Sequence, residues 1–354
     1  VYIVAEAGVN HNGDLRRALS MVDAAALAGC DAVKFQTFRP EALVTRDAPQ
    51  AAYQMRNAGD CGSQLTMLRG LALGPEAHRS LQARCAERAI EFLSSPFDAA
   101  SADFLIHELG LTRIKLGSGE LTNAPLLLRL ARAQRDLVLS TGMATLDEIG
   151  DALGVLAFGY LQQGQPTGRC DLPAALGHPR AREVLRKRVT LLHCTSEYPC
   201  PFDQANLRAM DSLAEAFGLA VGYSDHTMGI QVSVAAAARG ACLLEKHFTL
   251  DRSLPGPDHA ASLEPDELGA LVSAVRVVSK ALGSAEKVPA AAERDNLRMA
   301  RKSLVAAHPI RAGERFSDAN LTTKRPGSGR SPLDYWELLG ARSPRDYAAD
   351  EVIE

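Results

Sequence analysis

The stretch LAVGYSDHTMGIQVSVAAAARGACLLEKHFTL, residues 219–250, carries the pattern that decides the fold. Two apolar runs, residues 219–225 and 241–250, flank residues 229–239, where apolar side chains recur at the spacing of a helix. Strands that are buried on both faces are nearly continuous in apolar residues, as these two runs are. The stretch therefore predicts a strand, a helix and a second strand parallel to the first.

The same alternation extends over most of the chain. Six further apolar runs predict strands at residues 2–8, 31–37, 90–96, 112–118, 136–142 and 189–196. Helical patterns lie at residues 15–28, 99–109, 124–133, 146–159, 206–216 and 265–281. Eight strands that alternate with helices predict a TIM (β/α)8 barrel of the α/β class over residues 1–283. An open doubly wound sheet uses the same alternation, but no GxGxxG turn follows the first run, which favours the barrel.

The pattern changes after residue 283. Residues 284–299 are small, polar and Pro-containing and predict a linker. Short strand-like runs at residues 302–307, 310–314 and 321–324 then predict a small β-rich domain over residues 300–354. A domain of this size buries little apolar surface, so we expect it to need a partner surface.

Two connections within the barrel are long. Residues 38–74 separate the second and third strands, and residues 162–188 follow the fifth. Long connections at the carboxyl ends of barrel strands are often lids, so residues 38–74 are the candidate lid. Residues 162–188 contain a basic run, for which a solvated surface is the ordinary interpretation.

Composition excludes several classes of function. The net charge is −3 and aromatic residues make up 5%, which argues against a nucleic-acid partner. The longest apolar stretches are too short to cross a bilayer, so no membrane partner is expected. The seven cysteines are scattered without a CxxC pair, which argues against a disulfide framework or a Cys-rich zinc site and favours a reducing cytoplasm.

Polar residues stand where the predicted strands end, which is where barrel enzymes place their sites. Two lysines and several hydroxyls there suit an anion that carries both phosphate and carboxylate groups. These residues are Lys34, Lys115, Ser95, Ser118, Ser140 and Thr141, next to the Gly-Ser-Gly turn of residues 117–119.

Two histidines, His226 and His247, end neighbouring strands. Neighbouring strands lie about 4.8 Å apart, so two imidazoles at matching heights could chelate one divalent metal. Glu6 on the adjacent first strand is a candidate third ligand, a base or a substrate contact. A third group, Gln36, Tyr198, Glu245 and Asp258, suits the hydroxyls of a polyol.

Seven motifs, read together, resemble the sialic acid synthase family of phosphoenolpyruvate-dependent nonulosonate synthases. They are AEAGVNHNG (5–13), VKFQT (33–37), KLGSGE (115–120), LSTGM (139–143), YSDHT (223–227), EKHFT (245–249) and PGPDH (255–259). The C-terminal segment, with KRPG at 324–327, resembles the antifreeze-like SAF domain of that family.

The resemblance implies condensation of phosphoenolpyruvate with N-acetylmannosamine to give N-acetylneuraminate and phosphate. It implies Mn²⁺ bound by His226 and His247, and a homodimer that exchanges SAF domains and brings Arg325 to the partner's site. Phosphoenolpyruvate would be held by Lys34, Ser95, Lys115, Ser118, Ser140 and Ser196. Some members have Asn where this chain has Ser196. The N-acylated sugar would be held by Gln36, Tyr198, Glu245 and Asp258, with Glu6 handling protons.

Other functions stay open from the sequence. Synthesis of N,N′-diacetyllegionaminate needs the same centre but a 2,4-diacetamido-6-deoxymannose acceptor. A phosphorylated acceptor would need a second phosphate site, which the sequence does not suggest. An octulosonate or heptulosonate phosphate synthase would leave the C-terminal domain unexplained. A non-catalytic carbohydrate-binding protein is the alternative outside enzymes.

Overall fold

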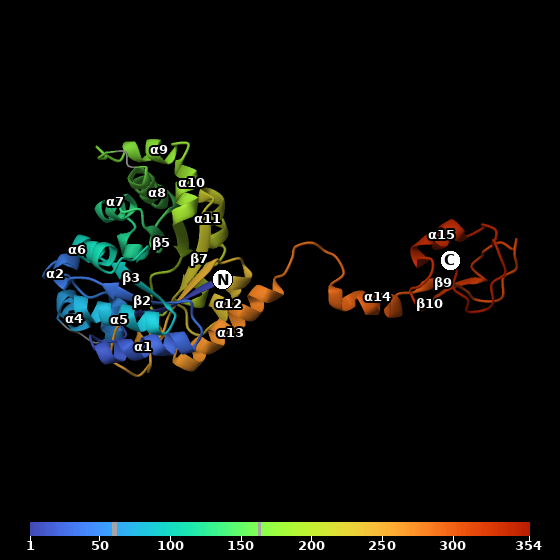
Figure 1. Cartoon of the computed structure of the whole chain (residues 1–354), viewed down its shortest axis with the longest axis horizontal. Coiled ribbons are helices and arrows are strands. Elements are labelled where there is room, and N and C mark those ends of the chain that lie inside the picture. The colour runs from blue at the N-terminus through green and yellow to red at the C-terminus, as the bar shows by residue number, and fades with distance from the viewer. Residues whose placement is uncertain (59–61, 162–163) are drawn as a thin grey trace. The chain divides into compact units, whose positions relative to one another are not determined.

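The computed structural model describes residues 1–58, 62–161 and 164–354. The chain divides into two compact units, Val1–Gly283 and Ser284–Glu354 (Figure 1). The sequence placed the end of the barrel domain at the same residue, 283.

The first unit is built on eight parallel strands. They are β1 (Tyr2–Gly8), β2 (Ala32–Thr37), β3 (Glu91–Pro96), β4 (Arg113–Leu116), β5 (Asp136–Ser140), β6 (Val189–His193), β7 (Ala220–Asp225) and β8 (Leu243–His247). Their order is β3-β2-β1-β8-β7-β6-β5-β4, and β3 packs against β4. Because β1 pairs with β8 and the two ends of the order meet, the predicted TIM-like barrel is confirmed and the open sheet is wrong.

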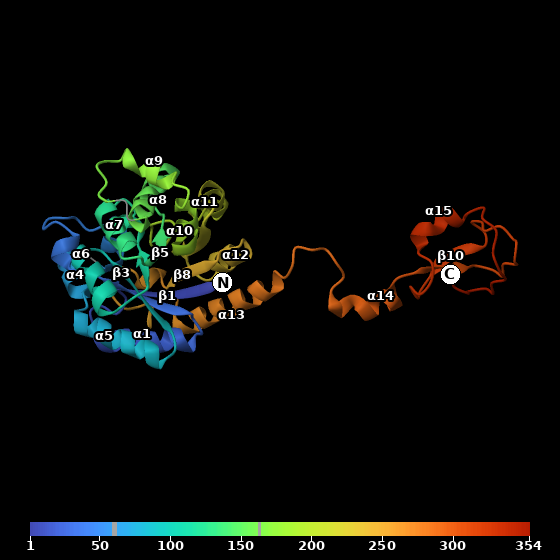
Figure 2. The same ribbon diagram turned by 45° about the horizontal axis from the view of Figure 1, so that its top comes forward.

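Helices cover the strands on the outside (Figure 2). The longer ones are α1 (Leu15–Leu27), α5 (Pro75–Glu87), α7 (Ala124–Arg132), α8 (Leu146–Tyr160), α11 (Ala209–Phe217), α12 (Gln231–Ala238) and α13 (Pro265–Ala281). The helix α6 (Ala99–Asp103) continues as a π-helical turn, Phe104–Glu108, where the sequence predicted one helix. Thr145 and Glu148 begin α8 with a capping box, in which each side chain accepts from the other residue's backbone N–H.

The barrel interior is layered because side chains alternate along each strand. One apolar layer is formed by Val4, Ala32, Leu93, Val138, Leu192 and Leu243. Two residues farther along the same strands stand Glu6, Lys34, Ser95, Ser140, Cys194 and Glu245. The intervening residues, such as Ala5, Val33 and Leu244, belong to the core between strands and helices. The apolar layer thus forms the floor on which the polar layer stands.

Both long connections contain short helices. Residues 38–74 hold α2 (Pro40–Leu43), α3 (Ala52–Ala58) and α4 (Gln64–Leu71). Residues 162–188 hold α9 (Asp171–Leu176) and α10 (Ala181–Arg188), and the basic run lies on α10. Short 3₁₀ turns follow three of the strands, at Ser118–Glu120, Phe202–Gln204 and His259–Ala261.

The second unit has its own small core. β9 (Ser303–Ala306) and β10 (Leu321–Lys324) pair antiparallel, and the 3₁₀ turn Pro332–Asp334 leads into α15 (Tyr335–Leu338). The core is Leu304, Ala306, Ile310, Phe316, Leu321, Leu338, Tyr347 and Ile353.

Two expectations for this unit were wrong in detail. Residues 310–314 form no strand, and Ile310 makes one isolated bridge to Tyr347. The predicted linker of residues 284–299 contains a 3₁₀ turn, Ala291–Glu293, and most of helix α14 (Arg294–Ala300). The sequence RDNLRMA explains this helix, because Leu, Arg, Met and Ala favour helices and Asp295 lies in the first turn.

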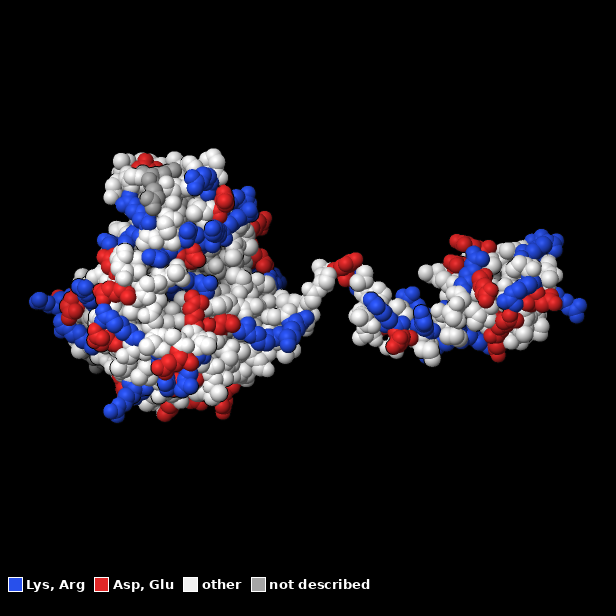
Figure 3. Space-filling model, viewed as in Figure 1, with Lys and Arg blue, Asp and Glu red and all other residues white. Residues whose placement is uncertain are grey.

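All six cysteines in the described part of the chain are free, and Cys61 lies outside it. No helix among the described residues is both long and apolar enough to cross a membrane. On the face shown in Figure 3, positive and negative side chains are intermixed on both units.

The floor of the barrel provides a test of the packing. A Cβ on Gly222 of β7 would lie 2.3 Å from the carbonyl oxygen of Leu243 and 2.7 Å from Leu192 Cδ2. We therefore expect Gly222→Ala to lower the free energy of unfolding by about 1–3 kcal/mol through overpacking, measured by urea denaturation. The control is Gly269→Ala in α13, where a Cβ meets nothing within 4 Å and should stabilise by about 0.5–1 kcal/mol. Equal effects of the two substitutions would contradict the packing described here.

Candidate active site

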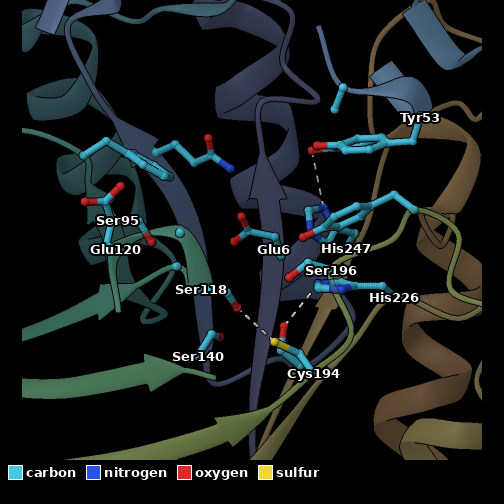
Figure 4. A pocket seen from close by; sticks show the side chains of 18 of the residues that line it. Glu6, Tyr53, Ser95, Ser118, Glu120, Ser140, Cys194, Ser196, His226 and His247 are labelled. Carbon is cyan, nitrogen blue, oxygen red and sulfur yellow. Dashed lines mark hydrogen bonds and ion pairs between the residues drawn. The ribbon is translucent and has the colours of Figure 1, made fainter. Parts of the chain in front are cut away.

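A cavity of about 550 Å³ opens at the carboxyl ends of the barrel strands. It is lined by Glu6, Lys34, Gln36, Ser95, Lys115, Ser118, Ser140, Ser196, Tyr198, His226, Glu245, His247 and Asp258. These are all of the predicted site residues except Thr141 and Arg325. Arg325 lies in the second unit after β10 and donates to Ala300 O at 3.0 Å. In Figure 4, Glu6 points into the space between the serines and the two histidines.

A cluster of four buried ionisable side chains forms the base of the cavity. Lys34 Nζ lies 3.0 Å from Glu6 Oε2 and 3.3 Å from Glu245 Oε2. Lys115 Nζ lies 3.2 Å from Glu245 Oε1. Ser224, a residue outside the predicted set, donates to Glu245 Oε1 at 2.8 Å. Buried charges need such pairing, because an isolated one loses its hydration without compensation.

The two carboxyls of this cluster differ in acidity. Burial raises the pKa of Glu6 to about 8, against the opposing effect of Lys34. Burial also opposes ionisation of Glu245, but Lys115 and Lys34 together hold the pKa of Glu245 well below its ordinary value. Burial lowers the pKa of Lys115, whereas for Lys34 the carboxylates of Glu245 and Glu6 outweigh burial and raise its pKa. The cluster thus holds two lysines beside one strongly acidic carboxyl, Glu245, and one weakly acidic carboxyl, Glu6, which suits an anion.

Hydroxyls surround the two lysines. Lys34 Nζ donates to Ser95 Oγ at 3.3 Å, and Ser118 Oγ accepts from Gly142 N at 3.0 Å. The hydroxyl of Ser140 is buried and has no hydrogen-bond partner within the described chain, so it is available to a ligand. Thr141 was wrongly included in the anion cradle, because its hydroxyl donates to Leu192 O at 2.9 Å and does not line the cavity.

The two histidines lie next to each other on the cavity wall, with ring centroids 5.5 Å apart. His226 Nδ1 lies 2.6 Å from Thr195 O. Since a carbonyl oxygen only accepts, Nδ1 carries the proton and Nε2 keeps its lone pair. His247 Nδ1 is buried without a hydrogen-bond partner in the described residues. Burial lowers the pKa of His226 to about 4 and that of His247 well below its ordinary value.

Neutral imidazoles are the form that binds a metal. Within the described part of the chain, no group of three or more His, Cys, Asp and Glu side chains is gathered as a metal-ligand set. The protein would therefore supply two nitrogen ligands and leave the other positions to water or substrate. The unpartnered Nδ1 of His247 fits that role, and so does Nε2 of His226, which keeps its lone pair and lies 3.4 Å from Ser224 Oγ.

A wall of aromatic and acidic residues lies next to the histidines. The Tyr198 ring centroid is 4.1 Å from that of His226 and 5.0 Å from that of Tyr53. Asp258 Oδ2 lies 3.8 Å from His247 Nδ1, and burial raises the pKa of Asp258 to about 6. This wall offers flat apolar surface and polar atoms together, as a sugar requires.

The candidate lid contributes to this wall. Asn57 of α3 donates its amide to Pro257 O at 2.7 Å and to Tyr198 O at 3.3 Å, and Arg56 pairs with Glu197 at 2.5 Å. The helix α3 is thus attached to two of the loops that carry predicted site residues. Tyr53, on the same helix, lines the cavity and was missed by the sequence analysis. Only the identification of residues 38–74 as a lid pointed towards it.

Glu120, Cys194 and Ser224 also line the cavity. They stand at predicted strand ends but were left out of the predicted site. Strand periodicity would have placed Cys194 and Ser224 on the inner face, two residues beyond Leu192 and Gly222.

Comparison with known proteins agrees with this geometry. Residues 21–287 match the NeuB family model and residues 301–354 match the SAF domain model. The chain belongs to the NeuB family of nonulosonate synthases. The SAF match covers the unit that the sequence analysis identified by resemblance.

Individual NeuB relatives cover nearly the whole chain. An N,N′-diacetyllegionaminic acid synthase of Campylobacter jejuni is 47% identical over 99% of this chain and 98% of its own. A protein of the same name from Legionella pneumophila is 41% identical over 99% of this chain and 93% of its own. The crystal structure of an N-acetylneuraminic acid synthetase from Leptospira borgpetersenii superposes with a TM-score of 0.68 at 31% identity, over 84% of this chain and 90% of that one. The protein is thus an enzyme, a synthase of the nonulosonic acid type.

The acidity of Glu6 can be tested through stability. Its folded-state pKa of about 8 exceeds its ordinary value of 4.5, so the stability it contributes is full below pH 4.5 and is lost as the pH rises through 8. Glutamine does not titrate, so the Tm of Glu6→Gln relative to wild type should rise between about pH 5 and pH 8.

The control for this measurement is Glu215→Gln, at an exposed position of α11, which should show no such trend. A Glu6→Gln protein that is less stable than wild type by a constant amount at every pH would instead mean that Glu6 is ionised and paired with Lys34.

Proposed function

We propose that the enzyme condenses phosphoenolpyruvate with 2,4-diacetamido-2,4,6-trideoxymannose to give N,N′-diacetyllegionaminic acid and phosphate. The observation that carries the choice of acceptor is the end-to-end identity of 47% with a synthase of that product. From the sequence, N-acetylmannosamine was the preferred acceptor and this sugar the alternative. The relatives reverse that order.

The cavity supports an acceptor without phosphate. Lys34 and Lys115 are the only cations among the described residues that line it, and both lie in the cluster with Glu6 and Glu245. They are needed for the phosphate and carboxylate of phosphoenolpyruvate, together with Ser95, Ser118, Ser140 and Ser196. No second set of cations is left for a phosphate on the sugar.

The reaction forms one C–C bond and breaks one C–O bond. The enol carbon of phosphoenolpyruvate attacks the acceptor aldehyde, and positive charge develops at the carbon that bears the phosphate. Protonated Glu6 gives its proton to the aldehyde oxygen, which becomes a hydroxyl. Water adds to the positive carbon and returns a proton to Glu6. The resulting tetrahedral centre expels phosphate by C–O cleavage, and its hydroxyl proton leaves with the phosphate.

The remaining residues bind and orient. Lys34 and Lys115 hold the anion while charge builds next to it. Gln36, Tyr198, Glu245 and Asp258 orient the sugar. His226 and His247 would hold a divalent cation, which we propose to be Mn²⁺, and a bound cation of this kind supplies Lewis-acid polarisation of a carbonyl oxygen.

A product assay tests the function. The purified protein with phosphoenolpyruvate and Mn²⁺ should release phosphate and form a 2-keto-3-deoxy acid fastest with the 2,4-diacetamido-6-deoxy acceptor. We expect at least tenfold lower kcat/KM with N-acetylmannosamine and no turnover of its 6-phosphate, since each lost set of polar or apolar contacts costs about 1–3 kcal/mol. EDTA should remove the activity and Mn²⁺ restore it.

Three other outcomes of this assay would each overturn one part of the proposal. Preference for N-acetylmannosamine would overturn the choice of acceptor and keep the reaction. Full activity after chelation would overturn the role of the metal. No product with any acylamino sugar would favour a carbohydrate-binding protein.

We also propose a homodimer in which the SAF domain of one subunit brings Arg325 to the site of the other. Its support is the resemblance to the family and the exposed position of Arg325 on a unit with a small core of its own. His226→Ala and Arg325→Ala proteins should each be inactive. Mixed and re-equilibrated in equal amounts, they should recover about a quarter of wild-type activity, because half of the dimers then hold one intact site. No recovery would mean that Arg325 acts within its own subunit, and an active Arg325→Ala protein would mean that it has no role in the reaction.

A further inference from the structure

A buried ion pair lies directly behind the two histidines. Lys246 Nζ is 3.0 Å from Asp225 Oδ2, and both side chains have an exposed fraction of 0%. Each partner is the chain neighbour of one imidazole, since Asp225 precedes His226 and Lys246 precedes His247. Because side chains alternate along a strand, the imidazoles line the cavity while the pair lies on the opposite, helix-covered face.

Hydrogen bonds from this pair hold the backbone on both sides of His226. Asp225 Oδ1 accepts from Thr227 N at 2.9 Å and from Thr227 Oγ1 at 2.8 Å, which closes a turn around His226. Lys246 Nζ donates to Thr227 O. Ser233 of α12 donates to Asp225 Oδ2 at 2.5 Å and connects the turn to the helix that follows it.

The pair also fixes the relative height of two strands. Asp225 of β7 stands directly opposite Lys246 of β8 in the parallel register, and the next residues along each strand are the two histidines. On the other side of β8, His247 stands opposite Glu6. A shift in the register of β7 relative to β8 would break the ion pair and separate the imidazoles at the same time.

From this geometry we infer that Asp225 and Lys246 are positioning residues, whose pairing sets the orientation of His226 and the common height of both imidazoles. The catalytic cluster does not use either side chain, because neither lines the cavity. As far as it concerns metal binding, the inference rests on the proposed function. The orientation of His226 does not depend on it.

The decisive variant removes both charges together. A buried ion pair that is replaced by uncharged residues of similar size often leaves stability unchanged or higher, whereas a single replacement leaves an unpaired charge. Asp225→Asn/Lys246→Met should therefore be more stable than Lys246→Met alone. It still lacks the bond from Lys246 to Thr227 O, so the turn around His226 should stay loose.

Two measurements report how firmly the turn holds His226. The Kd for Mn²⁺ alone, from the electron paramagnetic resonance signal of the free ion, should rise about tenfold in the double variant. In the metal-free protein, ¹⁵N spectra of labelled histidines should show His226 protonated on Nδ1 in wild type and as a mixture of tautomers in the double variant. Val275→Ala in the core under α13, a cavity variant distant from the site, should lower Tm and leave both signals at wild-type values.

The outcomes separate the inference from the proposed function. A double variant with wild-type Mn²⁺ affinity and an unchanged tautomer overturns the positioning role. Metal affinity that follows Tm in every variant, Val275→Ala included, overturns it as well. A wild-type protein that binds no Mn²⁺ refutes the proposed metal site, and the tautomer measurement then decides the inference alone. If the double variant does not fold, Ser233→Ala, which removes one hydrogen bond to Asp225 and keeps both charges of the ion pair, is measured in its place.

Discussion

The pairing of buried charges at the mouth of the barrel is the constraint on which the rest of the site depends. Lys34, Lys115 and Glu245 lie on three different strands, and each is buried beyond what an unpaired charge tolerates. Their mutual contacts make the burial possible and leave an excess of positive charge. Burial raises the pKa of Glu6, so a weakly acidic carboxyl lies next to the two lysines.

Because side chains alternate along each strand, the charged cluster belongs to a polar layer that stands on an apolar one. Apolar side chains such as Leu192 and Leu243 form a floor, and the polar layer begins two residues farther on. The residues between them face the helices. The same rule that aims His226 and His247 into the cavity places Asp225 and Lys246 behind them, so the outer face of two strands supports the chemistry on the inner face.

Surface charge contributes little to the binding of anions. The net charge is −3, and positive and negative side chains are mixed over the face that Figure 3 shows. Substrate anions would be met by two buried lysines, whose electrostatic effect is larger in a dry cavity than in water. Residues 38–74 add the wall on which Tyr53 lies, and helix α3 attaches that wall to the loops of Tyr198 and Asp258.

The sequence by itself determined the barrel, the second unit and most of the polar residues that line the cavity, because strand periodicity and the position of strand ends are local properties of the chain. It could not determine hydrogen-bond partners: Thr141 and Ser140 are neighbours at a strand end, yet one hydroxyl is bonded to Leu192 O and the other is free. It also missed Tyr53 and placed a strand at residues 310–314, where the small core permits only one bridge. Which of the two carboxyls is the weaker acid, and which ion pair lies behind the histidines, was decided only by the tertiary structure. Both depend on distances between strands that are far apart in the chain.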